Sequence, residues 1–210
     1  MPENERWVRL KERIKKEAGR LGIDKIGFAS AEPFTELLEV LKRHREKGRE
    51  SGFEERDLQK RVDPRLNFPN GEPRSIISIA VAYPAKMNHP PKSSPGAYRG
   101  IISRSAWGED YHRVLRDRLG KLEALLREEV PDCRVESMAD TGALVDRAVA
   151  ARAGIGWLGH NCSVITPEFG SWVYLGEMIT DIPFPPDTPV TESCGDCTVC
   201  LDACPTGALV

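Results

Sequence analysis

The stretch that decides the fold of this 210-residue sequence is Ser75-Ile76-Ile77-Ser78-Ile79-Ala80-Val81-Ala82. It is a continuous run of β-branched and small apolar residues, and such a run is typical of a strand that is buried on both faces. A strand of this kind belongs in a layered domain in which helices pack against a sheet.

The segments on either side of this strand fit the same architecture. Apolar residues at helical spacing predict helices over residues 7–21, 34–49, 111–130 and 144–153. Shorter apolar runs predict strands over residues 23–29 and 134–138, and a hairpin over 162–180 that turns at 167–170. This order indicates an α+β or α/β layered domain over residues 1–181, followed by a Pro-rich linker over 182–189.

The composition excludes several classes of protein. With 40% hydrophobic and 30% charged residues the chain can bury a good core, and its longest apolar stretch, residues 76–83, is too short to span a membrane. The formal net charge is −2, so any contact with nucleic acid must come from a local patch. Basic candidates lie over residues 42–49 and 92–104, although plain solvated surface is the favoured interpretation of both. The N-terminus carries no apolar secretory segment, and we therefore expect a cytoplasmic protein.

Four cysteines near the C-terminus, followed by a proline, match C-x2-C-x2-C-x3-C-P, which is the spacing of bacterial ferredoxins. They are Cys194, Cys197, Cys200 and Cys204. We expect the first three thiolates to bind one 4Fe-4S cluster and the fourth to bind a second cluster. The chain stops six residues after the fourth cysteine without a second run of this kind. We therefore expect a fragment in which residues 182–210 are the truncated start of a ferredoxin-type domain with two clusters.

Zinc and disulfides explain this cysteine spacing less well. Structural zinc usually pairs two C-x2-C knuckles across a longer loop and does not require the trailing Cys-Pro. Cysteines two residues apart on one loop are poorly placed to bridge each other. The other two cysteines, Cys133 and Cys162, stand outside any motif, and we interpret both as structural residues, because a buried free cysteine behaves as a small hydrophobe.

A carboxylate stands between a predicted strand and a predicted helix in Ser137-Met138-Ala139-Asp140-Thr141-Gly142. Asp140 or Thr141 can cap the helix by accepting hydrogen bonds from its first free amides, and capping is the common use of Asp at such a junction. A strand-to-helix junction is also where layered folds place ligand sites. A functional role for Asp140 is therefore compatible with a capping role.

Three glycines at 154, 156 and 159 form G-x-G-x-x-G. They follow a helix rather than a strand, so the context of a dinucleotide-binding turn is absent. We interpret them as positions where the backbone approaches a flat ligand closely or turns tightly into the hairpin.

A second polar string, Ser103-Arg104-Ser105-Ala106-Trp107-Gly108-Glu109-Asp110-Tyr111-His112, leads into the helix predicted at 111–130. Asp110 can cap that helix, and a surface position explains His112 better than a metal site does. The string nevertheless combines hydrogen-bonding groups with an aromatic ring, which suits a ligand that is partly charged and partly flat.

Taken together, three strings resemble the epoxyqueuosine reductase family: residues 103–112, residues 139–161 and the cysteine run at 194–205. They occur in the order and at the separations of that family, so the resemblance covers essentially the whole chain. The family depends on iron–sulfur clusters and cobalamin, and it reduces the epoxide of epoxyqueuosine at the wobble position of tRNA. The resemblance implies a cobalamin-binding domain like that of reductive dehalogenases, followed by a two-cluster ferredoxin domain and helical repeats. The second cysteine set and the repeats are missing from this sequence.

The resemblance also implies roles for particular residues. Asp140 would be the proton donor, and it would take part in a cobalamin site with Arg61, Ser103, Arg104 and Tyr111. A carboxyl group against the cofactor and the nucleoside would be desolvated, and desolvation favours the protonated form. The implied partners are tRNA carrying epoxyqueuosine in its anticodon loop, presented as a nucleotide turned out of the stack, and an external electron donor of the flavodoxin or ferredoxin type. We expect a monomer that does not bind membranes.

Two other functions are compatible with parts of the sequence. One is an enzyme like the reductive dehalogenases, which would use the same cofactors on an organohalide. The absence of a twin-arginine export signal and the string at 139–161 argue against it. The other is a non-catalytic iron–sulfur electron carrier, which would need only the cysteine run and would leave most of the chain without a purpose.

Overall fold

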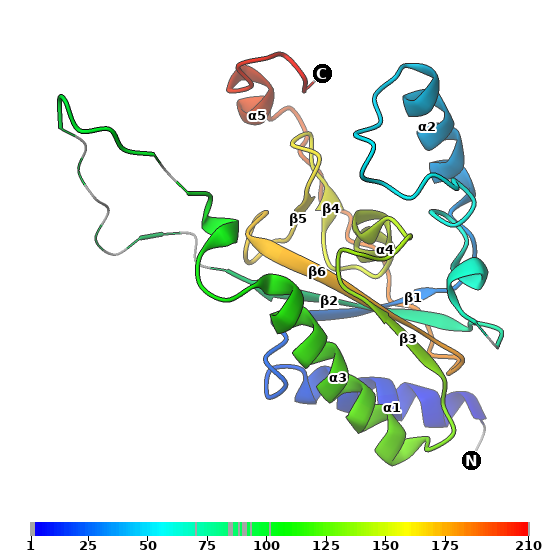
Figure 1. Ribbon diagram of the computed structural model, residues 1–210. Coiled ribbons are helices and arrows are strands. Elements are labelled where there is room, and N and C mark those ends of the chain that lie inside the picture. Colours follow the sequence, from blue (N-terminus) through cyan, green and yellow to red (C-terminus); the bar gives the residue numbers. More distant parts are fainter. Residues whose placement is uncertain are drawn as a thin grey trace.

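The computed structural model describes residues 3–69, 71–83, 86–87, 89, 92, 94–100 and 102–209. Its centre is a four-stranded sheet in the order β1-β2-β6-β3, in which each neighbouring pair is antiparallel (Figure 1). The strands are β1 (Lys25–Ser30), β2 (Ser75–Ala82), β6 (Val173–Thr180) and β3 (Val135–Met138). The run Ser75–Ala82 is confirmed as an inner strand, and its first six residues are buried.

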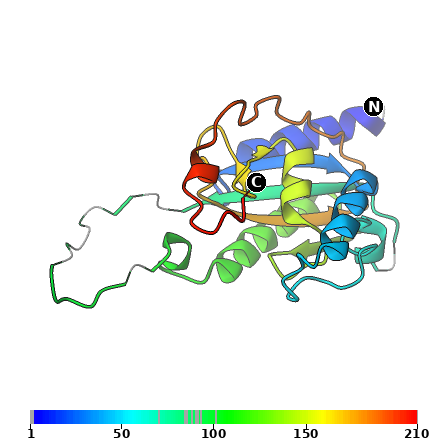
Figure 2. The same cartoon turned by 90° about the horizontal axis from the view of Figure 1, so that it is seen from above.

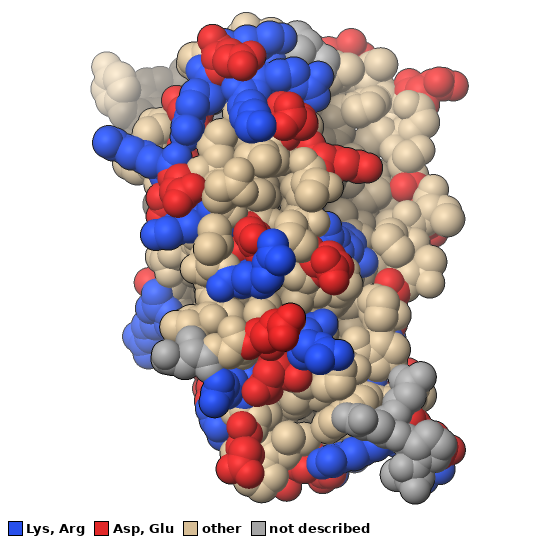
Figure 3. Space-filling view, turned by 90° about the vertical axis from the view of Figure 1, so that its right-hand side faces the viewer, with Lys and Arg blue, Asp and Glu red and all other residues tan. Residues whose placement is uncertain are grey.

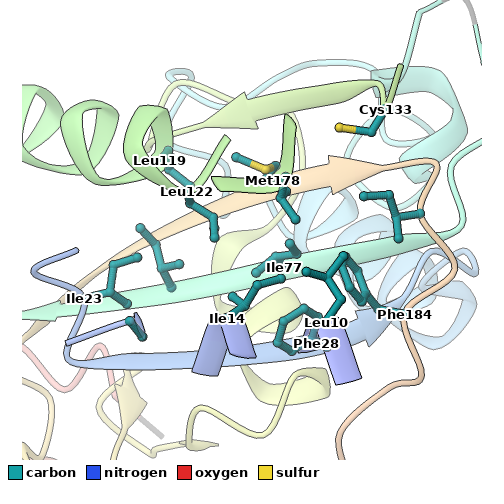
Figure 4. Close-up of a cluster of buried hydrophobic side chains, with 14 of the residues drawn as sticks. Leu10, Ile14, Ile23, Phe28, Ile77, Leu119, Leu122, Cys133, Met178 and Phe184 are labelled. Atoms are coloured by element: carbon teal, nitrogen blue, oxygen red, sulfur yellow. The ribbon is translucent and has the colours of Figure 1, made fainter. Parts of the chain in front are cut away.

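Helices cover both faces of the sheet. Helices α1 (Glu3–Glu17) and α3 (Tyr111–Glu129) lie below the sheet in Figure 1, and the short helix α4 (Asp146–Arg152) lies above it. Helix α2 (Thr35–Glu46) lies on the same side as α4, which Figure 2 shows from above. The sheet therefore separates two apolar cores. One, with Phe28, Ile77 and Met178, lies between the sheet and helices α1 and α3 (Figure 4), and the other, with Ile76 and Ile179, lies between the sheet and α4.

The antiparallel pairing decides between the two fold classes left open by the sequence. The domain is α+β, because no parallel crossover joins its described strands. The predicted helices at 7–21, 34–49, 111–130 and 144–153 correspond to α1, α2, α3 and α4, with ends that differ by a few residues. Two single-turn 3-10 helices, Pro64–Asn67 and Arg104–Ala106, lie in the connections.

The hairpin predicted over 162–180 is wrong in its pairing. The turn exists, since Thr166 and Gly170 form an isolated bridge. However, β5 (Val164–Ile165) pairs with β4 (Trp157–Leu158), and β6 pairs with β2 and β3. Strand β6 has its last five residues buried, so its place inside the main sheet outweighs a local pairing with β5.

The predicted linker over residues 182–189 packs against the body of the domain. Ile182 and Phe184 are buried in the core between the sheet and helices α1 and α3. Asp187 exchanges hydrogen bonds with the backbone of Phe28 on β1, with its N–H 2.7 Å from the carbonyl oxygen and its Oδ2 3.0 Å from the Phe28 N–H. The chain then continues to the short helix α5 (Val199–Asp202).

The connection between β2 and α3 includes the loop of Pro, Gly and Ser residues at 84–100. Residues 84, 85, 88, 90, 91 and 93 of it lie outside the described residues, as does residue 101. The residues described between β2 and the 3-10 helix at Arg104–Ala106 form neither helix nor strand. Among the residues described, there is no helix with the length and apolar character needed to cross a membrane.

Candidate active site

Asp140 lies two residues beyond β3, at the centre of a three-residue turn. The Thr141 N–H donates to the Ala139 carbonyl oxygen at 2.7 Å, and Asp140 itself has φ of 61°. This is the γ-turn with positive φ, a rare and strained form for a residue with a side chain. The capping interpretation is therefore wrong, because α4 begins only at Asp146 and its N-cap is Val145. Strain of this kind concentrates at functional sites.

Two hollows meet at this turn. One has a volume of about 480 Å³ and is walled by tyrosines, among them Tyr83, Tyr111 and Tyr174. The other has a volume of about 970 Å³ and is bordered by residues 53–56, by Arg61 and by residues 140–147. Three side chains belong to both hollows: Asp140, Asp146 and Arg147. Acidic and basic groups thus stand together where the two spaces join.

A stack of aromatic rings holds the Asp140 side chain. The Tyr111 hydroxyl donates to Asp140 Oδ2 at 2.5 Å, and His112 Nε2 lies 3.2 Å from the same oxygen. The Tyr111 ring stacks on His112 and on Tyr174, with centroids 4.0 and 4.8 Å apart, and Tyr174 stacks in turn on Tyr83 at 4.4 Å. Asp140 is still 55% exposed, so the desolvation expected of it does not come from the described residues alone.

The pKa values of two members of this stack, Tyr111 and His112, are raised, and hydrogen bonds to neighbouring carboxyl groups contribute to both. Burial, together with the hydrogen bond to Asp140, raises the pKa of Tyr111 far above its usual value, so its hydroxyl stays a donor. The hydrogen bond from His112 to Asp110, 2.8 Å long, raises the pKa of His112 against a smaller effect of burial, and the contact with Asp140 adds to it. Asp110 also caps α3 by accepting from the His112 N–H, which confirms the capping role predicted for it.

The residues that the resemblance assigned to the site are only partly together. Arg61 borders the larger hollow and Tyr111 the smaller one, so the fold brings both to Asp140. Ser103 and Arg104 do not border either hollow. The Ser103 hydroxyl contacts that of Ser105 at 2.8 Å, and the Arg104 guanidinium lies over the Trp172 ring at 5.1 Å. Their roles stay predictions.

The sequence assigns no role to several side chains of the site, although Asp146 and Arg147 lie within the string 139–161. Tyr83 and Tyr174 come from the same end of two neighbouring strands, and Arg147 and Asp146 come from the first turn of α4. The sequence alone gives little indication that these four residues lie near Asp140, because their positions depend on strand pairing and on where α4 begins. Glu177 was also missed, although a glutamate inside the apolar run 173–180 is itself a signal of a buried polar group.

The four cysteines of the ferredoxin-type run are all free thiols on the segment around α5. Among the described residues, no three His, Cys, Asp or Glu side chains converge on a metal position. Hydrogen bonds from the Leu209 N–H and from Thr206 lower the pKa of Cys204 to about 7, which favours its thiolate. This segment contacts the β4–β5 hairpin, where His160 Nδ1 lies 3.2 Å from the Cys197 carbonyl oxygen.

Cys162 corrects a prediction. Cys133 is buried, as expected of a structural residue, but Cys162 is exposed and has φ of 62°. Its carbonyl oxygen accepts a hydrogen bond from Arg147. The tight turn between β4 and β5 requires a left-handed residue at this position, and that turn brings the cysteine to the surface.

The glycines of G-x-G-x-x-G serve close packing and turning. A Cβ on Gly156 would come within 2.2 Å of the Ile165 carbonyl oxygen, and Gly154 ends α4 with φ of 73°. These positions confirm the tight turn into the hairpin, here the one formed by β4 and β5, and the strand-first context of a dinucleotide site is absent.

The side chains present fit the groups that the resemblance implies. An aromatic wall beside polar and charged side chains suits a large, partly flat and partly charged ligand such as a corrinoid. Four unpaired thiols, one of them with a lowered pKa, are a donor set suited to iron–sulfur clusters.

Comparisons with known proteins give the family. The family model "Epoxyqueuosine reductase QueG, DUF1730" matches residues 61–141. The epoxyqueuosine reductase of Bacillus cereus is 58% identical over 204 residues, which are 97% of this chain and 53% of that protein. This chain thus spans about half the length of the curated relatives that it matches.

Solved structures agree with this result. An epoxyqueuosine reductase with an epoxyqueuosine-modified tRNA-Tyr stem loop is 52% identical and superposes with a TM-score of 0.91 over 97% of this chain and 53% of that one. The Bacillus subtilis enzyme, solved with its aspartate-bearing catalytic loop swung out of the active site, is 51% identical with a TM-score of 0.91 over the same shares. A reductive dehalogenase, described with a mechanism for B12-dependent dehalogenation, is 14% identical with a TM-score of 0.55 over 96% of this chain and 26% of that one, and it shares the fold alone. The chain therefore belongs to the epoxyqueuosine reductase family.

Proposed function

We propose that the full-length protein reduces epoxyqueuosine in tRNA to queuosine, the last step of queuosine formation. The observation that carries this proposal is Asp140, a strained aspartate held by Tyr111 at the junction of two hollows. The relatives that match 97% of this chain are epoxyqueuosine reductases, and one of them was solved with a modified tRNA stem loop.

The reaction sets what the site must supply. Turning an epoxide into an alkene removes the oxygen as water and consumes two electrons and two protons. Bound cobalamin, reduced through 4Fe-4S clusters, would supply the electrons at carbon. Cys194, Cys197 and Cys200 would hold the first cluster and Cys204 the second, and an external carrier of the flavodoxin or ferredoxin type would reload them.

The protein's own groups position the substrate and move protons. Asp140 would carry a proton to the epoxide oxygen, because its carboxyl group lies where both hollows reach it. Tyr111 and His112 fix its orientation through Oδ2. Arg61 and Tyr111 border the space in which the cofactor would be bound, and Ser103 and Arg104 would contribute to that site from the 103–112 segment.

The tRNA would present its modified nucleotide turned out of the anticodon loop. Basic side chains gather at the top of Figure 3, where α2 lies, but acidic side chains lie among them. Lys42 pairs with Glu39 and Arg45 with Glu50, at 2.8 and 2.9 Å. This internal neutralisation favours a solvated face over a phosphate-binding surface for residues 42–49.

The test uses the full-length protein and the variant Asp140→Asn. Loss of a general acid lowers turnover by ~10²-fold or more, while cobalamin binding, followed by its visible spectrum, should stay at the wild-type level. The readout is the ratio of epoxyqueuosine to queuosine in digested tRNA. Asp132→Asn, which makes the same change on an exposed position, is the matched control.

Two results would contradict the proposal. Turnover of Asp140→Asn close to that of the wild type removes Asp140 from the reaction. A wild-type protein that shows iron–sulfur absorption but no corrinoid bands after anaerobic reconstitution is an electron carrier and not this enzyme.

A further inference from the structure

Glu177 is a buried acid in the middle of the sheet. It lies on β6 with 1% of its surface exposed. Its neighbours across the sheet are Ser78 on β2 and Met138 on β3. Among the described residues, neither carboxyl oxygen receives a hydrogen bond from an N–H or hydroxyl donor, and the Ser78 hydroxyl is unpaired as well. A carboxylate without such donors is costly to bury, so this group has to be a neutral carboxylic acid.

The group that Glu177 meets is another acid. Alternate residues of β6 face α4, as shown by Leu175 and Ile179 in the core on that side, so Glu177 points toward α4 as well. Helix α4 begins at Asp146, whose carboxyl group lies near enough to that of Glu177 for each to shift the pKa of the other, and a proton on Glu177 would let the two groups share a hydrogen bond. Two neighbouring carboxylates repel each other, and Glu177 is buried without a donor, so we expect the pair to hold one proton, on Glu177.

Asp146 connects this buried proton to the site. Its side chain is half-buried and borders both hollows, as Asp140 and Arg147 do. Glu177 borders neither hollow. The pair therefore runs from the interior of the sheet to the space in which the epoxide would be bound.

We propose that Asp146 is the second acid of the site and that Glu177 supplies the proton that Asp146 delivers. This inference rests on the proposed function, in which the departing oxygen takes up two protons and leaves as water. Asp140 gives the first proton and Asp146 the second. The second proton is that of Glu177: it passes to Asp146 along the hydrogen bond that it would form between the two groups, and Asp146 delivers it. Glu177 is then ionised until, after product release, water in the hollow returns a proton through Asp146.

The charges around the pair support its protonation. Burial is the main cause that raises the pKa of Glu177, and the negative charge of Asp146 and of Asp140 adds to it. Burial also raises the pKa of Asp146, with Asp140 acting in the same direction, while a hydrogen bond with Glu177 and the charge of Arg147 act against it. Among the described residues, those directly opposite Glu177 in the sheet are uncharged: Ser78 on β2, with its neutral hydroxyl, and Met138 on β3.

The first test detects the proton itself. Infrared difference spectra of the full-length protein, recorded in an Asp140→Asn background so that Asp140 does not contribute, should contain at neutral pH the carbonyl band of a protonated carboxylic acid. Glu177→Gln should lose this band, because the amide donates to Asp146 and leaves it ionised. Asp146→Asn should keep the band, because burial alone keeps Glu177 neutral. Glu136→Gln, the same change on an exposed position of β3, should leave the spectrum unchanged.

The second test measures turnover on tRNA that contains epoxyqueuosine. Glu177→Gln and Asp146→Asn should each lower kcat by ~10²-fold, with KM for the tRNA and cobalamin binding unchanged. The wild type should lose activity as the pH rises and the pair ionises. In Glu177→Gln that loss should occur at lower pH, because Asp146 no longer receives a proton from within the sheet.

The outcomes separate the relay from its alternatives. An infrared band that persists in Glu177→Gln, or kcat of both variants close to that of the wild type, overturns the proposal. If Glu177→Gln does not fold, Asp146→Asn decides by keeping the band and losing kcat. A wild-type protein that leaves epoxyqueuosine unreduced overturns the proposed function and with it the catalytic role of Asp146. The infrared result would then still report whether the pair holds a proton.

Discussion

At the scale of a single residue, the backbone conformation at Asp140 favours glycine, whereas the site needs a carboxyl group there. Its backbone occupies a left-handed conformation that glycine adopts more readily, while its side chain supplies the carboxyl group at the junction of the two hollows. Its hydrogen bonds to Tyr111 and His112 hold that carboxyl group in place. The backbone cost and the chemical role can therefore be measured separately.

Substitution of Asp140 by glycine and by alanine separates them. Asp140→Gly removes the strain at positive φ, whereas Asp140→Ala keeps it, so the glycine variant should be more stable by about 0.5–1 kcal/mol. Both variants should lack turnover, because neither carries a carboxyl group. Urea unfolding of the two variants measures the difference. Equal stabilities would mean that residue 140 does not hold a positive φ in solution.

The Tyr111 hydroxyl should matter for catalysis more than for folding. Tyr111→Phe keeps the ring stack with Tyr174 and His112 and removes only the donor to Asp140. Loss of one charge-assisted hydrogen bond costs about 1.5–3 kcal/mol, which corresponds to a fall in kcat of roughly 10-fold to 150-fold. Tyr98→Phe, on a fully exposed tyrosine, should leave kcat unchanged. An unaltered kcat in Tyr111→Phe would show that this hydrogen bond does not position the acid.

The sequence predicts the identity of Asp140 better than its conformation. The string around it points to a carboxylate at the end of a strand, and that position is correct. The predicted cap is wrong because Leu144 is buried in the core on the α4 side of the sheet. The chain after Asp140 therefore runs inward to that core first, and α4 begins only after it. Local sequence does not contain that tertiary constraint.

At the scale of elements, α4 lies along one row of the sheet. Gly27, Ser78 and Glu177 face one another across β1, β2 and β6. The end of α4 comes so close to the first of them that a Cβ on Gly27 would stand 2.0 Å from the Ala153 carbonyl oxygen. The other end of α4 carries Asp146 above Glu177. Because Gly27 on β1 has no side chain, α4, which carries part of the site, can pack this close to the sheet.

Gly27→Ala should therefore destabilise the domain. The new methyl group meets backbone and cannot be relieved by a side-chain rotation, and overpacking of this kind costs typically about 1–3 kcal/mol. Gly120→Ala is the matched control: it lies within α3 with open space around it, so it should stabilise by about 0.5–1 kcal/mol. Thermal unfolding distinguishes the opposite signs. A stable Gly27→Ala protein would show that α4 does not lie this close to β1.

The buried acid on β6 should reduce stability as the pH rises. Burial raises the pKa of Glu177 in the folded state, so the folded protein binds more protons than the unfolded chain above the ordinary pKa of Glu. Its unfavourable effect is absent below that pH and grows as the pH rises toward the folded pKa. Glu177→Gln removes the effect and should raise the melting temperature at neutral and alkaline pH but not at about pH 4. A variant less stable at every pH would contradict a neutral acid at this position.

The sequence predicts helices and strands correctly where they depend on local periodicity. It fails where a strand pairs with distant parts of the chain. The helix at 111–130 is found almost to the residue, because Asp110 caps it and Pro131 follows its end. The strand 75–82 is likewise correct. The hairpin at 162–180 is wrong because β6 finds its partners in β2 and β3, more than thirty residues away in the chain.

At the scale of the whole molecule, one segment joins the domain to the cysteine run. Residues 182–189 read as a linker in the sequence, because prolines dominate them. In the fold the segment runs beside the outer strand β1, where Asp187 bonds to Phe28. It also passes so close to the end of α4 that a Cβ on Gly154 would meet the Thr188 carbonyl oxygen at 2.6 Å. The segment thereby closes a free sheet edge and brings the cysteines to the β4–β5 hairpin.

Asp187 is the main polar anchor of this segment, and its replacement should loosen it. Its Oδ1 lies 2.8 Å from Lys11 Nζ and 2.6 Å from Lys15 Nζ, and Lys11 is itself buried. Asp187→Asn leaves the Lys11 charge without its carboxylate, which should cost about 1–3 kcal/mol. The double variant with Lys11→Met should recover part of that loss, because it removes the unpaired charge as well.

The pH dependence of this loss identifies its cause. Burial acts to raise the pKa of Asp187, but hydrogen bonds from Lys11 and Lys15 outweigh it and hold the pKa below its usual value. The ion pairs therefore stabilise the fold fully above the ordinary pKa of Asp and lose their effect as the pH falls through the lower folded pKa. Urea unfolding of Asp187→Asn should show its full deficit relative to the wild type at about pH 7 and a much smaller deficit at about pH 2–3. An equal deficit at both pH values would assign the loss to packing, because a lost contact between uncharged groups does not depend on the ionisation of Asp187.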